Sequence, residues 1–116
     1  MYELRSREEF IRAIIGNEVV LIGFYDPGDS ESRVFDESLK SLERVIDQRI
    51  LVCRVNLKDH PDCGVNVLQT PSIRVYYRGE VIFEQIGCLS TVDLNVNVIR
   101  RGIRDVFAKR AINIRI

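Results

Sequence analysis

Val19-Val20-Leu21-Ile22-Gly23-Phe24-Tyr25, followed directly by Asp26-Pro27-Gly28, is the stretch that decides the fold. Its nearly unbroken run of apolar and β-branched residues predicts a strand that is buried on both faces, as central strands of parallel sheets are. Proline and glycine end such a strand, and Asp29 or Ser30 can then cap a helix. The stretch therefore predicts the centre of an α/β domain.

The residues after this stretch continue the alternation of helix and strand. A helix that runs to about Gln48 is predicted by apolar positions at intervals of four, three and four residues: Phe35, Leu39, Leu42 and Ile46. The run from Ile50 to Leu57 is again apolar and β-branched, and His60-Pro61 follows it before a short helical turn that ends at Cys63. A helix between two such strands predicts a right-handed parallel βαβ unit.

A first helix precedes the central stretch. Ser6-Arg7-Glu8-Glu9 has the pattern of a capping box, and Gly16-Asn17 marks the point where the helix stops. The apolar residues at helical spacing between these signals are Phe10, Ile11, Ile14 and Ile15.

The second half of the chain predicts a hairpin and a last helix. Two strands over 73–77 and 81–86 are joined by Arg78-Gly79-Glu80, a connection short enough for an antiparallel hairpin. Ser90-Thr91-Val92-Asp93 has the pattern of a helix cap. The apolar stripe expected on this helix is Leu94, Val98, Ile103, Val106 and Phe107.

The predicted order α-β-α-β-α-β-β-α fits one domain over residues 1–116, with a basic and apolar tail at 108–116. We expect an α/β fold whose mixed sheet of four to five strands joins a parallel βαβ half to an antiparallel hairpin half, with helices flanking it. A chain of 116 residues buries enough surface to fold without metal or disulfide staples.

The composition is that of an ordinary globular protein, with 46% hydrophobic and 29% charged residues. Seventeen basic and 17 acidic residues give a net charge of zero, so no overall field favours nucleic acid or an anionic membrane. No apolar stretch reaches the ~18 residues needed to cross a bilayer, and the charged N-terminus lacks the apolar core of a signal peptide. We therefore predict a cytoplasmic location, and the abundance of Ile, Val and Arg favours a heat-adapted source.

The cysteine and histidine content limits the chemistry. Cys53, Cys63 and Cys88 form no C-x-x-C pair, and their odd number argues against a zinc site or a secreted disulfide framework. We expect reduced thiols packed as small hydrophobes, with a Cys63 to Cys88 bridge left open. His60 is the single histidine, and no glycine-rich phosphate loop occurs. No metal and no cofactor is therefore expected.

Four segments of the chain are informative in their order: Val20 to Tyr25; Val55-Asn56-Leu57 with Pro61; Gly64 to Ser72, which contains Thr70-Pro71; and Ile86 to Ser90. Together they resemble the thioredoxin family. They look like the strand before its active site, the next strand and its exit, the segment that ends in its cis-proline, and the entry to its final helix. The resemblance runs from about Phe10 to Phe107 and implies a thioredoxin fold with a cis-proline loop.

The resemblance fails at the residues that carry thioredoxin chemistry. Counting from Phe24, the positions of the two redox cysteines fall on Asp29 and Ser32, within Asp29-Ser30-Glu31-Ser32. In the family, a helix N-terminus stabilises the first thiolate and the second thiol resolves the mixed disulfide, which a carboxylate and a hydroxyl cannot do. The family's buried acid falls on Gly23, and its tryptophan falls on Gly28. The resemblance therefore implies a redox-inactive thioredoxin-like protein, without catalytic residues for dithiol exchange.

The resemblance retains a docking surface. A cis Thr70-Pro71 bond presents main-chain groups that pair with an extended strand in the family, and Gly87-Cys88 flanks the same groove. The implied function is a non-catalytic binding, chaperone or assembly module for a protein or extended peptide. The alternative is a thiol-dependent oxidoreductase or redox sensor that acts through Cys88 alone. The nearby carboxylates of Asp29 and Glu31 argue against it, because negative charge raises the pKa of a thiol.

The last part of the chain is basic and ends in alternating isoleucines. Against Asp105 alone, the basic residues after Asn97 are Arg100, Arg101, Arg104, Lys109, Arg110 and Arg115. We expect them to be solvated and to complement the helix dipole, with an acidic partner or RNA as the alternative. Nucleic acid is disfavoured because no aromatic residues are interleaved with the arginines. Ile112, Ile114 and Ile116 alternate as in a strand, and predict pairing at a sheet edge of the same fold or of a second subunit in a homodimer.

Overall fold

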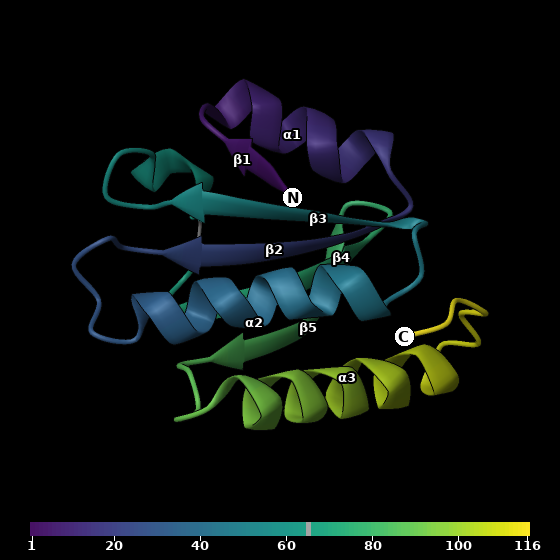
Figure 1. Ribbon diagram of the computed structural model, residues 1–116. Helices are drawn as coiled ribbons and strands as arrows, with labels where there is room; N and C mark the ends of the chain where they lie inside the picture. Colours follow the sequence, from purple (N-terminus) through teal and green to yellow (C-terminus); the bar gives the residue numbers. More distant parts are fainter. Residues whose placement is uncertain (65) are drawn as a thin grey trace.

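A five-stranded sheet runs through the middle of the molecule in the computed structural model, which describes residues 1–64 and 66–116. In chain order the elements are β1 (Tyr2–Leu4), α1 (Arg7–Gly16), β2 (Val19–Tyr25), α2 (Ser32–Val45), β3 (Ile50–Asn56), the 3₁₀ turn η1 (Pro61–Cys63), β4 (Ser72–Tyr77), β5 (Glu80–Ile86) and α3 (Val92–Lys109). The strand order is β1-β3-β2-β4-β5 (Figure 1). The first three of these strands are parallel, and β4 and β5 continue the sheet antiparallel.

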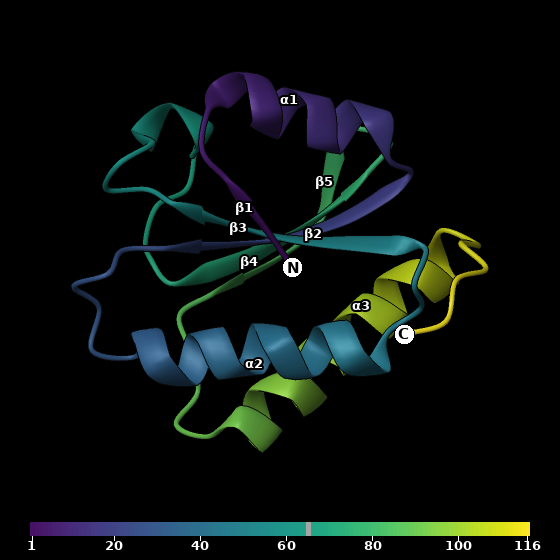
Figure 2. The same ribbon diagram turned by 45° about the horizontal axis from the view of Figure 1, so that its top comes forward.

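Helices cover both faces of the sheet. Figure 2 shows α1 on one side and α2 and α3 together on the other. The core between the sheet and α1 contains Phe10 and Phe24, whereas the core on the other side contains Leu21, Leu39 and Ile103. The expected α/β architecture, with a parallel half and a hairpin half, is confirmed.

The central strand has the bounds that the sequence predicts. β2 pairs in parallel with β3 and antiparallel with β4, so it has a partner strand on both sides. Val19 to Ile22 and Phe24 have no exposed surface. Burial on both faces explains why this strand carries an apolar run and not an alternating pattern.

The first strand is absent from the sequence prediction. Tyr2–Leu4 pairs in parallel with β3, with Tyr2 opposite Cys53. Only Leu4 of the three is buried. A three-residue edge strand with one buried side chain is too short to show a period of two.

The first helix is capped as expected, but its buried face differs from the prediction. The Ser6 hydroxyl accepts a hydrogen bond from the Glu9 main-chain N–H at 3.0 Å, and the Glu9 carboxylate accepts from the N–H of Arg5. Ile11 and Ile15, expected inside, are exposed by 40% and 71%. The residues that α1 buries are Phe10, Ala13 and Ile14. Alanine at the third buried position narrows the apolar face, which leaves the two isoleucines outside.

The second helix buries the stripe that the sequence predicts. Phe35, Leu39, Leu42 and Ile46 are all at most 6% exposed. The helix ends at Val45 and not near Gln48, because Ile46 is already extended. Asp47 then closes a turn in which its carbonyl accepts from the N–H of Ile50 at 3.0 Å.

The last helix buries a different stripe from the predicted one. Leu94 and Val98 are 50% and 42% exposed, and Val106 is half-buried. The residues buried instead are Asn95, Ile99, Ile103 and Phe107. Gly102 lets α3 approach β5 closely, because a Cβ there would lie 2.5 Å from a ring carbon of Phe83. Within the described ranges, no helix combines the length and hydrophobicity that crossing a membrane requires.

The predicted strand over the last five residues is wrong. Residues 112–116 have no regular secondary structure and fold back onto the same chain. Ile116 is 6% exposed in the core below α2 and α3, and Ile112 and Ile114 pack against that core. The Arg115 carbonyl accepts from the Asp47 N–H at 3.1 Å. These isoleucines are therefore largely used within their own chain, and the homodimer through them stays a prediction.

Candidate functional site

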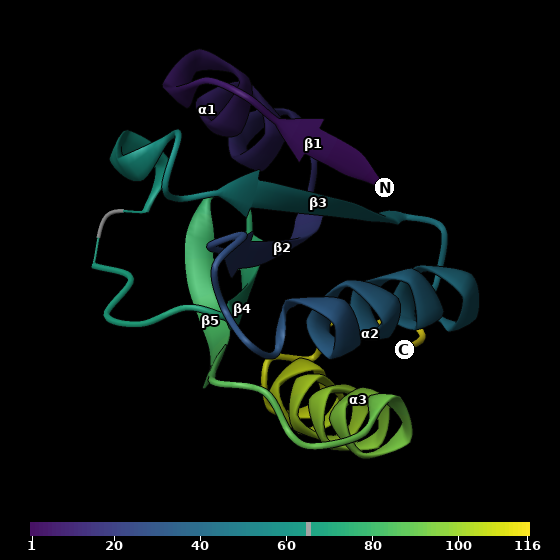
Figure 3. The same ribbon diagram turned by 60° about the vertical axis from the view of Figure 1, so that its left-hand side comes forward.

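Three loops meet at one end of the sheet, the end that faces the viewer in Figure 3. They are residues 26–31 after β2, residues 66–71 before β4 and residues 87–91 after β5. We call them the cis-proline edge, because the Thr70–Pro71 peptide bond is cis. Thr70 contacts the first loop through Asp29, and Pro71 contacts the third loop through Gly87. The loops come from distant parts of the sequence, and the hydrogen bonds around Thr70-Pro71 hold them together. Val65, part of the resembling segment, lies outside the described residues.

The first loop is fixed by its own carboxylates. Asp26 accepts a hydrogen bond from the Gly28 N–H at 2.8 Å, and Asp29 accepts from the Asp26 N–H at 3.1 Å. The Asp26 carbonyl accepts from the Asp29 N–H at 3.0 Å. Short aspartate side chains stabilise tight turns in this way. The loop therefore has a defined shape before anything binds to it.

Asp29 does not cap the second helix, so that prediction is wrong. The cap residue is Glu31, and its side chain makes no capping hydrogen bond. The Asp29 carboxylate instead accepts from the Thr70 hydroxyl at 3.3 Å. A residue at the family's first cysteine position thus links the first loop to the cis-proline segment. Ser30 and Glu31 are exposed, and Ser32 is the first residue of α2.

The main chain of the cis-proline segment is partly available for a partner. The Pro71 carbonyl accepts from the Gly87 N–H at 2.8 Å. In the part of the chain that the structure describes, the N–H and carbonyl of Thr70 have no hydrogen bond. Gly87 has a φ of +86°, with open space where a Cβ would stand, so its backbone conformation and not crowding requires glycine. Thr70 therefore offers one donor and one acceptor at the edge of a sheet.

Two exposed leucines flank these groups. Leu68 is 85% exposed and lies two residues before Thr70. Leu89 is 40% exposed and lies two residues after Gly87. The sequence analysis did not single them out, because exposure of an apolar side chain is not visible in a loop sequence. Together they give the edge apolar surface on both sides of the cis-proline.

Asn95 organises the third loop and was missed by the sequence analysis. It is 2% exposed, and its side-chain oxygen accepts from the Leu89 N–H at 2.6 Å. Its side-chain nitrogen donates to Cys88 Sγ at 3.0 Å and to Ser38 Oγ at 3.2 Å. It also donates to the Leu89 carbonyl at 3.2 Å. One buried amide thus holds the wall that contains Gly87 and Cys88 against α2.

The three cysteines are free in the structure, and burial raises the pKa of each thiol. The pKa of Cys53 rises to about 12. Cys88 is half-buried, and the charge of Glu31 adds to the rise in its pKa, while the hydrogen bond from Asn95 opposes it. A raised pKa keeps a thiol protonated at neutral pH and so makes it a poor nucleophile. The contact between Cys88 and the acidic loop has the direction that the sequence predicted.

The interior below the edge is apolar at the position of the family's buried acid. A Cβ on Gly23 would lie 2.5 Å from Leu39 Cδ1 and 3.1 Å from Phe35 Cε2. Leucine and phenylalanine therefore fill the space where a carboxyl group would stand. Gly23 lies opposite Ile73 in β4 and Arg54 in β3.

Arg54 centres an ion cluster beside this position that no sequence motif indicated. Its Nε donates to Glu3 at 2.6 Å, and its guanidinium also pairs with Asp36. Tyr25 donates its hydroxyl to Glu3 at 3.1 Å, and Arg54 lies 5.6 Å from the centre of the Tyr25 ring. Burial and then Glu3 raise the pKa of Tyr25. Lys40 pairs with Asp36 at 3.0 Å, so the positive and negative side chains balance.

Comparison with solved structures identifies the fold. A Plasmodium falciparum thioredoxin superposes with a TM-score of 0.78 at 16% identity, over 90% of this chain and 98% of that one. Mitochondrial thioredoxin 3 from Saccharomyces cerevisiae gives 0.76 at 20% identity, over 90% and 94%. A thioredoxin from Trypanosoma brucei brucei gives 0.76 at 16% identity, over 93% and 91%.

These similarities define an α/β protein of the βαβ-plus-hairpin class. More specifically, the chain has the thioredoxin fold. No protein-family model matches the chain, and no curated protein is significantly similar to it in sequence.

Proposed function

We propose that this protein is a non-catalytic binding module that takes up an extended segment of a partner protein at the cis-proline edge, in a chaperone or assembly role. The observation that carries the proposal is the free main-chain N–H and carbonyl of Thr70, held in place by Asp29 and by the Pro71 to Gly87 hydrogen bond. An extended peptide adds to such an edge through main-chain hydrogen bonds, and side-chain contacts select its sequence.

The surroundings of Thr70 indicate the chemistry of the partner segment. Leu68 and Leu89 supply apolar contacts on both sides, and Asp29 and Glu31 lie at one end of the edge. An extended segment with apolar residues and a basic residue suits this arrangement. Aspartate and serine at positions 29 and 32 support binding without dithiol exchange, because neither can form a disulfide. Three free thiols suit a reducing compartment such as the cytoplasm.

The alternative, a single-thiol function of Cys88, shares this location. Its thiol lies on the wall of the proposed groove, but its pKa is raised by burial and by Glu31. A binding module does not need that thiol. C88S should therefore bind peptide as the wild type does, whereas a Cys88-dependent function would be lost in this variant.

The proposal is tested with unstructured peptides that carry apolar and basic residues, titrated into the protein and followed by amide chemical shifts. We expect saturable shifts at Thr70 and Gly87, and a loss of about tenfold in affinity in L68D and L89D, because each variant replaces an apolar contact with a charge. V45D is the matched control, since Val45 is 48% exposed on the last turn of α2. Equal weakening in all three variants, or shifts that avoid the cis-proline edge, would contradict the proposal.

A further inference from the structure

The basic residues of the last helix are not explained by its dipole. Only Lys109 lies in the last turn of α3. Arg100, Arg101 and Arg104 lie further inside, whereas the favourable effect of a helix C-terminus on cations is confined to its final turn. The expectation that the basic residues complement the dipole therefore fails for these three arginines, and another role has to account for them.

The same arginines are not neutralised by side chains. Among the described residues, the ion pairs of the molecule use other cations, and none joins a carboxylate side chain to Arg100, Arg104 or Arg115. Arg104 donates to the main-chain carbonyl of Ile116 at 3.1 Å. Arg54 and Arg74, by contrast, each pair with a glutamate at 2.6 Å.

The fold brings three of these guanidinium groups to one pocket. Residues 112–116 turn back along α3 and enclose a volume of about 410 Å³, which we call the arginine pocket. Arg100 and Arg104 line it from α3, and Arg115 lines it from the returning segment. Its apolar lining residues are Phe107, Ala108, Ile112, Ile114 and Ile116.

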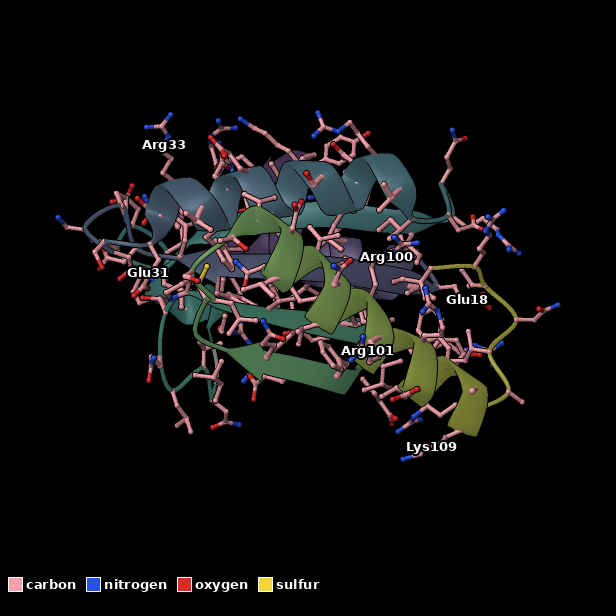
Figure 4. All side chains as sticks on the ribbon, turned by 60° about the horizontal axis from the view of Figure 1, so that its bottom comes forward. Glu18, Glu31, Arg33, Arg100, Arg101 and Lys109 are labelled. Atoms are coloured by element: carbon pink, nitrogen blue, oxygen red, sulfur yellow. The ribbon has the colours of Figure 1, made fainter. Side chains whose placement is uncertain are left out.

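Arg100 carries an unmet hydrogen bond. Its Nε is buried and has no partner among the described residues. Figure 4 shows Arg100 between α2 and α3, with Lys109 at the far end of α3. A buried donor without an acceptor is costly, and such groups in native proteins call for an explanation such as a bound ion or ligand. An anion in the arginine pocket would supply both the missing acceptor and the missing negative charge.

We propose that the arginine pocket binds the phosphate group of a small phosphorylated molecule. Guanidinium groups bind phosphate through paired, charge-assisted hydrogen bonds, and three of them match a doubly charged oxyanion better than a single carboxylate. The apolar side chains accommodate the organic part of the ligand, and the volume falls within the range of small-molecule sites. The pocket lies at the opposite end of the molecule from the cis-proline edge (Figure 1), so this inference does not rest on the proposed function.

The test measures binding of inorganic phosphate, pyrophosphate and adenosine monophosphate by calorimetry at low salt. We expect saturable binding, with the organic phosphate tighter than inorganic phosphate because it also contacts the apolar wall. R100Q and R115Q should each weaken binding about tenfold or more, the loss expected for one charge-assisted group. R101Q is the matched control, because Arg101 is the next residue on the same helix and does not line the pocket.

Several results would overturn the proposal. One is the absence of saturable binding to all three probes, and another is equal weakening in R100Q and R101Q, which would indicate an unspecific basic surface. Tighter binding of a short RNA, with equal losses in R100Q, R101Q and K109Q, would assign the surface to nucleic acid instead. Citrate binding more tightly than every phosphate probe would assign the pocket to carboxylates. Thermal denaturation of each variant checks that the fold is intact, and a phosphate-induced rise in the melting temperature of wild type and R101Q, but not of R100Q, gives an independent readout.

Discussion

The cis-proline edge and the interior directly beneath it differ sharply in how they are built. At the edge, polar groups make the structure, since Asp29, Thr70 and Asn95 each hold a loop by hydrogen bonds. Beneath it, Leu39 and Phe35 close on Gly23 and leave no space for a titratable side chain. The geometry that can bind a peptide and the groups that could move protons are therefore separate features of this fold.

This difference has a physical basis. A cis-proline edge needs backbone geometry and a few hydrogen bonds, and those can persist whatever stands at the helix N-terminus. A buried acid needs a cavity and a proton acceptor to repay its desolvation. Once leucine and phenylalanine fill that cavity, close packing stabilises the interior and the acid can no longer be accommodated. The predictions below test the two regions in turn.

The largest effect is expected where the interior is forced to accept an acid. G23D places a side chain against Leu39 and buries a carboxyl group, so we expect a loss of about 3 kcal/mol or more in the free energy of unfolding. Because burial raises the pKa of such a carboxyl group above its unfolded value of about 4, the loss is smallest at acidic pH and grows as the pH rises through the folded-state pKa. Urea denaturation at several pH values measures it.

G23A is the control for this variant, because it adds the same Cβ without a charge. Its loss should be smaller and should not depend on pH, since alanine does not titrate. If G23D and G23A lose the same stability at every pH, the interior tolerates a carboxyl group and the contrast between the two regions fails.

The second effect concerns the buried amide that holds the third loop. N95A leaves the Leu89 N–H and the Ser38 hydroxyl without their partner, and should cost about 2 kcal/mol in the free energy of unfolding. N97A is the control, because Asn97 is exposed on the same helix. N95A should also raise the pKa of Cys88, since the hydrogen bond from Asn95 lowers it. An unchanged thiol titration in N95A would show that this contact is absent in solution.

A smaller effect is expected at the link between the first and second loops. D29A removes one hydrogen bond to the Thr70 hydroxyl and one to the Asp26 N–H, and because the site is partly exposed the cost should be about 1 kcal/mol. Peptide affinity should fall with it, because Thr70 is then less well positioned. T70V is the matched probe, and combining it with D29A gives a coupling energy. Fully additive losses would mean that the two residues do not interact.

The smallest change is a rate and not a stability. Alkylation of the folded protein followed by mass spectrometry should modify Cys88 first, and more slowly than a free thiol at neutral pH, because its pKa is raised. Cys53 and Cys63 should react only after denaturation, since both are buried. Rapid modification of Cys88 at neutral pH would favour the single-thiol function over the binding module.

The sequence predicts those features that depend on local pattern. The buried run at 19–25 has no other reading than a central strand, and the stripe of α2 repeats at helical spacing, so both are confirmed. β1 fails because three residues cannot show a period. In α3, Leu94 and Val98 were expected inside, but their alternation with Val92 and Val96 hid the register of the helix.

The site was predictable only in part, because its key contacts depend on tertiary structure. The order of segments indicates Pro71 and Gly87, and the structure brings them together. Asp29 has the residue type of a helix cap, and only the position of Thr70 shows what its carboxylate binds. Asn95 was missed because a polar side chain in a helix is usually exposed, and its burial follows from the loop it satisfies.

The most direct test is reduction of insulin by dithiothreitol in the presence of the purified protein, with an ordinary thioredoxin as the positive control. Since positions 29 and 32 hold carboxylate and hydroxyl oxygens in place of sulfur, insulin precipitation should proceed at the rate of dithiothreitol alone. Acceleration that approaches the thioredoxin control would contradict the account.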